Sequence, residues 1–245
     1  MSGFDDYYEL RIYRGTPGRM ADLHHRFGFE ARPLFDKHGA TRPLGYWEGH
    51  AGPFAPAYVY LHRWDSLDQR FEAFGKFYAD PDWNAQRIAS NAGEHMIDRA
   101  DIMFLRPSPA WDAHRPEGEP EPVGGLHELC FLPLNTQDAA EGQRVFGEID
   151  LPFLASRGAE VLGVFQVWFG WTTPQLVYFL AWDSFDARDA AMSAYQRDPD
   201  IGHQRLHERQ TYGGPLHFAG DTMLLEPAHY GTPVSGLAGP AVKTG

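Results

Sequence analysis

The sequence is short of cysteine, of positive charge and of long apolar runs, and each shortage excludes a class of protein. Its single cysteine, Cys130, rules out an internal disulfide and a cysteine-based metal cage. Lysine and arginine number 21 against 33 aspartates and glutamates, which gives a formal net charge of -12. Nucleic acids and anionic membrane surfaces attract clustered lysine and arginine, so we expect neither as a partner.

No apolar run approaches the roughly 20 residues that a membrane helix needs. The N-terminus also lacks the basic and apolar regions of a signal peptide, and we therefore expect a cytoplasmic protein. The chain is, in contrast, long and rich in aromatic residues. Its 245 residues suffice for one or two domains with a sizeable core, and 14% of them are aromatic.

The sequence repeats itself about halfway along. Tyr8-Glu9-Leu10 returns as His127-Glu128-Leu129, an offset of 127 − 8 = 119. Trp64-Asp65-Ser66 returns as Trp182-Asp183-Ser184, an offset of 182 − 64 = 118, and Asp80-Pro81-Asp82 returns as Asp198-Pro199-Asp200 at the same offset. Internal similarity at a nearly fixed spacing indicates two tandem copies of one unit.

Each copy predicts the order β-α-β-β-α-β, the ferredoxin-like split motif. In the first copy we expect strands near residues 8–13, 41–48, 57–64 and 102–106, and helices near 19–38, 67–78 and 83–91. In the second copy we expect a helix at 138–157, a hairpin at 159–168 and 174–182, and a last strand at 221–226. The predicted domains are 1–107 and 126–227, joined by a linker at 108–125 and followed by a Gly/Pro-rich tail at 228–245.

A four-stranded antiparallel sheet with helices on one face must have its other face covered. Two copies can supply that cover by packing sheet against sheet. We therefore predict an α+β fold whose two sheets form an α/β barrel, closed either within one chain or between chains.

The first strand has two chemically different faces. Tyr8, Leu10 and Ile12 share one face, and Glu9, Arg11 and Tyr13 share the other. We expect the apolar face to pack against helices, which leaves the polar face in solvent or lining a cavity of the barrel. The same alternation in the strand at 57–64 sends Tyr58, Tyr60, His62 and Trp64 to the polar side.

These residues form the candidate site. We expect His62 to act as general base or acid, Arg11 to hold a substrate oxygen anion, and Glu9 to orient Arg11 or move a proton. A structural Glu9–Arg11 pair with aromatic residues at the rim is the alternative. The residues expected to bind substrate come from both copies: Tyr46, Trp47, Tyr60, Trp64, Glu128, Gln166 and Trp168.

Two further features carry weaker hypotheses. Gln166 interrupts an apolar strand and needs a hydrogen-bond partner, unless it faces water at an edge. A set of four histidines, His95, His203, His207 and His217, is a candidate for metal binding. His203 and His207 lie four apart, a spacing that two metal ligands would use, but the His-Glu-x-x-His arrangement is absent. We expect solvated histidines there and no metal.

Several motifs of the first copy resemble the NIPSNAP family of the dimeric α/β-barrel superfamily. They are Tyr8-Glu9-Leu10-Arg11-x-Tyr13, Pro17-Gly18, Pro33 with His38-Gly39, Gly45-Tyr46-Trp47, Arg63-Trp64-Asp65-Ser66 and Asp80-Pro81-x-Trp83. The second copy departs from the pattern, because Cys130 stands where Arg11 would be. The resemblance implies the duplicated ferredoxin-like fold, a small-molecule cavity between the sheets, and a homodimer or higher homo-oligomer.

The wider superfamily includes cofactor-free monooxygenases, cyclases, isomerases and haem proteins. We predict a cofactor-independent enzyme, of the isomerase, cyclase, lyase or monooxygenase type, that uses acid–base chemistry on an aromatic or polyketide-like molecule. A non-catalytic ligand-binding or scaffold protein is the alternative, and a haem-binding protein is a third hypothesis. An enzyme should have a closed cavity in the barrel in which His62, Arg11 and Glu9 converge, whereas a scaffold should have that interior packed with aromatic side chains.

Overall fold

The computed structural model describes residues 7–116, 121–231 and 236–237. Its first half contains the following elements: β1 (Tyr7–Gly15), α1 (Met20–His25), the π-helical turn η1 (Arg26–Glu30), α2 (Ala31–Lys37), β2 (Gly45–Ala51), β3 (Ala57–Trp64), α3 (Leu67–Ala79), α4 (Pro81–Asn91) and β4 (Ile97–Pro107). A short 3-10 helix, η2 (Pro109–His114), leads toward the second half.

The second half repeats this order. It contains β5 (Leu126–Pro133), α5 (Ala139–Val145), the π-helical turn η3 (Phe146–Asp150), α6 (Leu151–Ser156), β6 (Glu160–Phe169), β7 (Gln175–Trp182), α7 (Phe185–Arg197), α8 (Pro199–Tyr212) and β8 (Asp221–Pro227). The helix expected at 138–157 is therefore present, with a π-helical turn inside it. The strand β4 begins five residues earlier than predicted, because its ladder with β1 extends to the pair Gly15 and Ile97.

Corresponding helices in the two halves begin with the same type of N-cap residue. Ser66 and Ser184 accept hydrogen bonds from the backbone N–H three residues on, at the starts of α3 and α7. Asp80 and Asp198 cap α4 and α8 in the same way, and each is followed by a proline whose missing N–H costs nothing at that position. Local sequence thus fixes these four helices in both copies.

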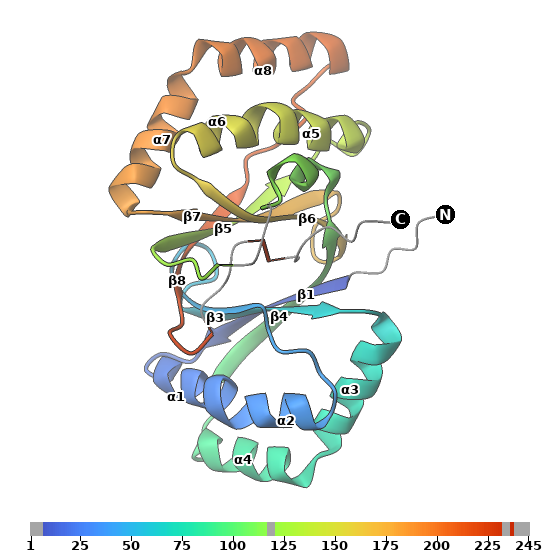
Figure 1. Cartoon of the computed structure of the whole chain (residues 1–245), viewed down its shortest axis with the longest axis vertical. Helices are drawn as coiled ribbons and strands as arrows, with labels where there is room; N and C mark the ends of the chain where they lie inside the picture. Colours follow the sequence, from blue (N-terminus) through green and yellow to red (C-terminus); the bar gives the residue numbers. More distant parts are fainter. Residues whose placement is uncertain (1–6, 117–120, 232–235, 238–245) are drawn as a thin grey trace.

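The strands form one closed antiparallel barrel in the order β1-β3-β2-β8-β5-β7-β6-β4. Each half contributes a sheet, and the sheets join where β2 pairs with β8 and where β4 pairs with β6. The barrel therefore closes within one chain. Helices α1 to α4 cover the outside of one sheet and α5 to α8 the outside of the other (Figure 1).

The barrel interior is packed with apolar side chains from both halves. The ring of Tyr8 lies 4.8 Å from that of Phe165, and Trp47 stacks on Phe179 at 5.1 Å. Trp111 of η2 is fully buried in the same core, 5.4 Å from Phe165. The residues predicted to be a linker therefore take part in the core.

The predicted assignment of the two faces of β1 was wrong. Tyr8, Leu10 and Ile12 belong to the core that spans both sheets, while Tyr13 packs on Phe27 beneath the helices of the first half. Period-2 alternation shows which residues share a face but not which side of the sheet that face meets. The interior of the barrel is enclosed by strands on all sides and takes the more apolar face. The polar face finds its partners on the helices.

The tail, predicted at 228–245, is described only in part. Residues 232–235 and 238–245 lie outside the described residues, as do 117–120 of the predicted linker. Within the described part, the hydroxyl of Tyr230 lies 2.7 Å from His24 Nδ1 and 2.9 Å from the hydroxyl of Tyr58. Within the described ranges, no helix combines the length and apolar character needed to cross a bilayer.

Candidate functional site

The three residues predicted to be catalytic do lie together, but between the first sheet and its helices. Glu9 and His62 are fully buried and Arg11 is nearly so. Glu9 accepts hydrogen bonds from Arg11 Nη1 at 3.1 Å, from the indole of Trp64 at 3.1 Å, and from Arg70 at 2.9 and 3.0 Å. None of the three lines a cavity found in the described structure. Glu9 and Arg11 thus form a buried network, in which Nε of Arg11 and Nε2 of the neighbouring His62 have no hydrogen-bond partner among the described residues.

The electrostatics of this network favour a structural role. Burial alone would raise the pKa of Glu9, but the hydrogen bonds of Arg70 and the charge of Arg11 lower it. Burial lowers the pKa of His62 to about 3, so its imidazole is neutral at physiological pH. A histidine that binds protons so weakly is a poor general base. The predicted catalytic roles of Glu9, Arg11 and His62 remain predictions.

The residues predicted to bind substrate are spread over three environments. Tyr46, Tyr60 and Trp64 pack beneath the helices of the first half. Trp47 instead points into the barrel interior, where its indole N–H donates to Nδ1 of His127 at 3.0 Å. These four side chains therefore do not line one pocket.

The remaining predicted binding residues belong to the second half. Glu128 is buried beneath α7 and accepts from the indole of Trp182 and from Arg188, both at 3.0 Å. Gln166 and Trp168 are partly exposed on β6, and the guanidinium of Arg106 lies 3.8 Å from the Trp168 ring centroid. Glu128 repeats the structural role of Glu9, and Gln166 and Trp168 lie outside the cavities described here.

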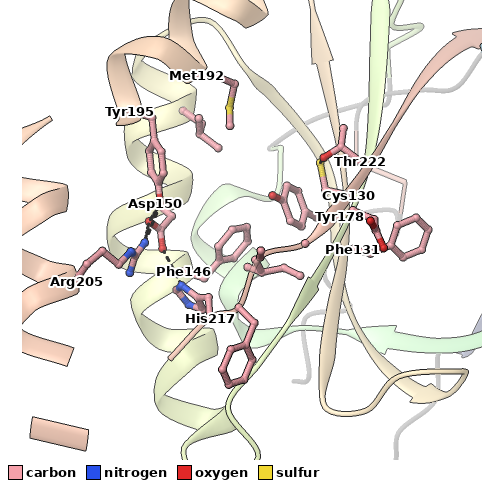
Figure 2. A pocket seen from close by; sticks show the side chains of 16 residues that line it. Cys130, Phe131, Phe146, Asp150, Tyr178, Met192, Tyr195, Arg205, His217 and Thr222 are labelled. Atoms are coloured by element: carbon pink, nitrogen blue, oxygen red, sulfur yellow. Dashed lines mark hydrogen bonds and ion pairs between the residues drawn. The ribbon is translucent and has the colours of Figure 1, made fainter. Parts of the chain in front are cut away.

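A cavity of about 340 Å³ opens between the second sheet and its helices (Figure 2). Its lining is part apolar and part polar. It comes from β5, the η3 turn, α6, β7, α7, α8, the segment between α8 and β8, and the start of β8. The lining residues are Cys130, Phe131, Leu132, Phe146, Asp150, Leu154, Tyr178, Met192, Tyr195, Arg205, His217, Phe218, Ala219, Gly220, Asp221 and Thr222. A mostly apolar concavity with a few convergent polar groups is the usual form of a small-molecule site.

Asp150 is the centre of the polar wall. Its Oδ1 accepts from the hydroxyl of Tyr195 at 2.5 Å and from Nη2 of Arg205. Its Oδ2 makes no hydrogen bond within the described residues and faces Nδ1 of His217 at 3.7 Å. Burial raises the pKa of Asp150, against the opposing charge of Arg205. This carboxyl therefore accepts a proton more readily than an exposed aspartate does.

His217 is oriented by its other ring nitrogen. Nε2 lies 2.8 Å from the carbonyl oxygen of Gly142, so Nε2 is the donor of that hydrogen bond. In neutral imidazole only one nitrogen carries hydrogen, which leaves Nδ1 with a lone pair directed to the side of Asp150. At 3.7 Å, Nδ1 of His217 and Oδ2 of Asp150 are too far apart for a direct hydrogen bond, so both atoms can accept a hydrogen bond from a ligand.

Buried Glu208 supports both members of this pair. It binds Nη1 of Arg205, whose other nitrogen holds Asp150, and its Oε2 accepts the backbone N–H of Leu216 at 3.2 Å. The residue after Leu216 is His217. One carboxylate on α8 thus holds the arginine that orients Asp150 and the backbone that carries the histidine.

The local sequence explains why Asp150 points inward. Phe146, Asp150 and Leu154 are spaced by four residues and line the same cavity, so Asp150 occupies an apolar-face position of its helix. The first copy has Phe27, Ala31 and Phe35 at the corresponding places, all buried. Asp150 also ends the π-helical turn η3, and such turns frequently occur at functional sites.

The same comparison explains why the described residues of the first half leave less room at the corresponding place. In the first half, Arg11 and Tyr13 fill the space above the sheet, and the Arg11 guanidinium lies 4.9 Å from the Phe74 ring centroid. The second half has Cys130, Leu132 and Met192 at these three positions, offset by 119, 119 and 118 residues (130 − 11, 132 − 13, 192 − 74). Smaller or more flexible side chains leave room for a ligand.

Sequence reasoning missed Asp150 and the role of His217. A signal was available for Asp150: a carboxylate four residues from Phe146 and four from Leu154 interrupts an apolar helix face. His217 was weighed only as a metal ligand with His203, His207 and His95. Within the described residues, no group of three or more histidines, cysteines or carboxylates is arranged to hold a metal ion.

Comparison with known proteins finds a family to which the first half is similar. Residues 8–110 match the family model described as NIPSNAP. A NIPSNAP family protein from Agrobacterium tumefaciens is 24% identical, over 42% of this chain and 94% of its own, with a TM-score of 0.37. No curated protein matches the chain.

Some solved structures match nearly the whole fold, and two of them serve as examples. An anthrone oxidase-like protein superposes with a TM-score of 0.55 at 15% identity, over 95% of this chain and 94% of its own. A protein described as a putative monooxygenase from Lactobacillus acidophilus gives 0.53 at 10% identity, over 94% of this chain and 99% of its own. At such identities the likeness is one of fold alone.

Proposed function

We propose that the protein, whose residues 8–110 match the NIPSNAP family model, is an enzyme whose active site is the cavity of the second half. The reaction we propose is proton transfer on a small, oxygenated aromatic molecule. The observation that carries the proposal is the buried pair of Asp150 Oδ2 and His217 Nδ1, 3.7 Å apart on the wall of a cavity lined by both apolar and polar side chains.

The geometry supports removal and return of one proton. A substrate with an acidic C–H or O–H group beside the pair gives its proton to Asp150 or His217, and the electron pair stays on the substrate as an enolate or phenolate. The raised pKa of Asp150 brings its proton affinity closer to that of such a substrate, which favours general acid–base catalysis. Return of the proton to another atom completes an isomerisation without any co-reactant.

The apolar part of the lining supports an aromatic ligand. The ring of Phe146 lies 4.8 Å from that of Tyr178 and 6.1 Å from that of His217. A planar ligand along Phe146 would place one substituent near the Asp150–His217 pair. A cavity of about 340 Å³ is at the small end of ligand sites, so one or two fused rings fit it best.

We also infer that the chain is a fused pair of ferredoxin-like units. The strand order is β4-β1-β3-β2 in the first half and β8-β5-β7-β6 in the second. The two orders are the same when four is added to each strand number of the first half. In this inference the first unit is structural and the second holds the site. The predicted domain boundaries and the predicted homo-oligomer remain proposals.

Proton exchange in deuterated water tests the function directly. With 2-tetralone as probe, NMR follows the loss of the protons next to its carbonyl. We expect the protein to accelerate this exchange, and Asp150→Asn to reduce the protein-catalysed rate by about 10²- to 10⁴-fold. His62→Gln should leave the rate unchanged, since His62 lies beneath the helices of the other half.

Two results would contradict the proposal. Exchange by Asp150→Asn at the wild-type rate would remove Asp150 from the chemistry. Binding of 2-tetralone without any accelerated exchange would instead favour the non-catalytic ligand-binding protein considered from the sequence.

A further inference from the structure

Three neutral polar side chains form a row across the wall opposite Asp150. Cys130 of β5 is the direct cross-strand partner of Tyr178 on β7 and of Thr222 on β8. All three line the cavity, and the hydroxyl of Thr222 lies 3.7 Å from Sγ of Cys130. Figure 2 shows this row on one side of the cavity and Asp150 with His217 on the other.

The first half has a different row at the same place in its sheet. Arg11 is the cross-strand partner of Tyr60 on one side and of Ile102 on the other. Relative to that row, the second half keeps a tyrosine, replaces the cation with a thiol, and replaces an aliphatic side chain with a hydroxyl. The change removes charge and adds hydrogen-bonding capacity.

The row stays uncharged at neutral pH. Burial raises the pKa of the Cys130 thiol well above its usual range, and the nearby charge of Glu128 acts in the same direction. Burial likewise raises the pKa of the Tyr178 phenol. Each of the three groups therefore stays protonated, and the Thr222 hydroxyl, which donates to Sγ of Cys130, can turn to a ligand oxygen that is a stronger acceptor than sulfur.

The charges around the cavity disfavour an anion. Among the described lining residues, Arg205 is the only arginine or lysine, and both of its terminal nitrogens are engaged by Asp150, Tyr195 and Glu208. Asp150 and Asp221 are the carboxylates of the lining. A ligand carboxylate or phosphate would enter without a free cation to pair with, which is costly in a partly desolvated site.

From this arrangement we propose that Tyr178, Cys130 and Thr222 form a recognition row for an uncharged oxygen substituent, a hydroxyl or a carbonyl, on the ligand. The ligand class is then neutral hydroxylated or keto aromatic compounds, and aromatic acids are excluded. The row deepens the proposed function, because it occupies the same cavity, but it makes a claim about binding alone.

Calorimetry with three probes of one ring system separates the contributions. 2-Naphthol carries the neutral oxygen, naphthalene lacks it, and 2-naphthoate carries an anion. We expect 2-naphthol to bind at least about 10-fold more tightly than 2-naphthoate. Tyr178→Phe and Thr222→Val keep the shape of the cavity, and each should weaken 2-naphthol by about 3- to 10-fold, the value of one neutral hydrogen bond, without weakening naphthalene. Thr211→Val on the exposed side of α8 is the matched control.

The proposal is overturned if none of the probes binds, if 2-naphthoate binds as tightly as 2-naphthol, or if both variants weaken naphthalene as much as 2-naphthol. These outcomes are independent of turnover. A protein that selects 2-naphthol through Tyr178 and Thr222 but never exchanges protons would uphold the recognition row and contradict the proposed enzyme.

Discussion

Glu9 and Glu128 occupy corresponding places in the two halves, and each buried carboxylate accepts hydrogen bonds from a tryptophan indole and an arginine. Trp64 and Arg70 supply the donors to Glu9, and Trp182 and Arg188 supply those to Glu128. The arginine comes from the first helix after the strand that ends in the tryptophan. Each trio therefore ties a helix to the face of its sheet.

The two trios differ in how deeply buried the arginine is that loses its partner when the carboxylate is replaced. Glu9→Gln leaves Arg11 without a carboxylate partner, and the side chain of Arg11 is only 4% exposed. Glu128→Gln does the same to Arg188, which is 19% exposed and can be hydrated. We expect losses of unfolding free energy of about 3–5 kcal/mol for Glu9→Gln and about 1–3 kcal/mol for Glu128→Gln. Urea denaturation measures both.

Glu72→Gln is the control for this comparison, because its partner Lys76 is exposed and the pair should be worth less than about 1 kcal/mol. If Glu9→Gln proved no more destabilising than Glu72→Gln, the structural role assigned to the Glu9 network would be wrong.

Two buried histidines should make the protein acid-sensitive. Burial lowers the pKa of His62 to about 3 and that of His127 to about 4. Both stay neutral in the folded protein but bind protons in the unfolded chain once the pH falls below about 6.5. Stability is therefore fully present above that pH and is lost as the pH falls toward 4. One pKa unit corresponds to about 1.4 kcal/mol, so each histidine should cost about 2 kcal/mol between pH 6.5 and 5.

Urea titrations of the wild type and His62→Gln at pH 7 and pH 5 check this dependence. The variant should be less stable than the wild type at pH 7 but should lose less stability on acidification. The loss that remains in the variant is the one due to His127. Glu9, whose pKa is lowered, adds its own loss only below the usual carboxyl range. An equal loss in both proteins between pH 7 and pH 5 would show that His62 is not held neutral.

The duplication and the order of elements were predictable because they depend on local signals. Trp64-Asp65-Ser66 and its counterpart at 182–184 end a strand and cap a helix, and both do so in the structure. Which face of β1 meets the barrel interior was not predictable from one strand, because Tyr8 and Glu9 differ in polarity but not in burial: both are fully buried. The decision depends on Arg70 and Trp64, which are distant in sequence from Glu9.

The candidate site was predictable only in part, for a related reason. A polar residue on an apolar helix face, as Asp150 is, could have been recognised from its spacing. His217 could not, because it comes from the segment between α8 and β8, and its place is set by Gly142 and Glu208 through contacts that span the half. The open space itself depends on what Cys130 and Leu132 lack relative to Arg11 and Tyr13.

The hydrogen bond between Trp47 and His127 joins the two halves inside the barrel. Trp47→Phe keeps the stacking surface for Phe179 but leaves Nδ1 of His127 without its donor. We expect a loss of about 1–3 kcal/mol of unfolding free energy, the cost of a buried unsatisfied acceptor. Trp171→Phe is the control, because Trp171 is 42% exposed, and it should change stability by less than about 0.5 kcal/mol. Equal effects of the two substitutions would contradict the link.

Refilling the cavity with side chains from the first half tests whether the open space is the functional feature. In Leu132→Tyr with Met192→Phe, the second half receives the counterparts of Tyr13 and Phe74, both of which are buried in the first half. We expect binding of 2-naphthol to weaken by more than about 10-fold and the proton exchange of 2-tetralone to fall to the buffer rate. The melting temperature should stay level or rise, because the added atoms fill a space rather than displace neighbours.

The reverse change in the first half separates loss of ligand from loss of packing. Phe74 is buried between sheet and helices, against the rings of Trp64 and His62, and lines no cavity described here. Phe74→Met should therefore lower the melting temperature and leave 2-naphthol binding unchanged. If 2-naphthol bound the refilled variant as tightly as the wild type, the ligand would occupy another site. That result would contradict both the proposed catalytic pair and the proposed recognition row.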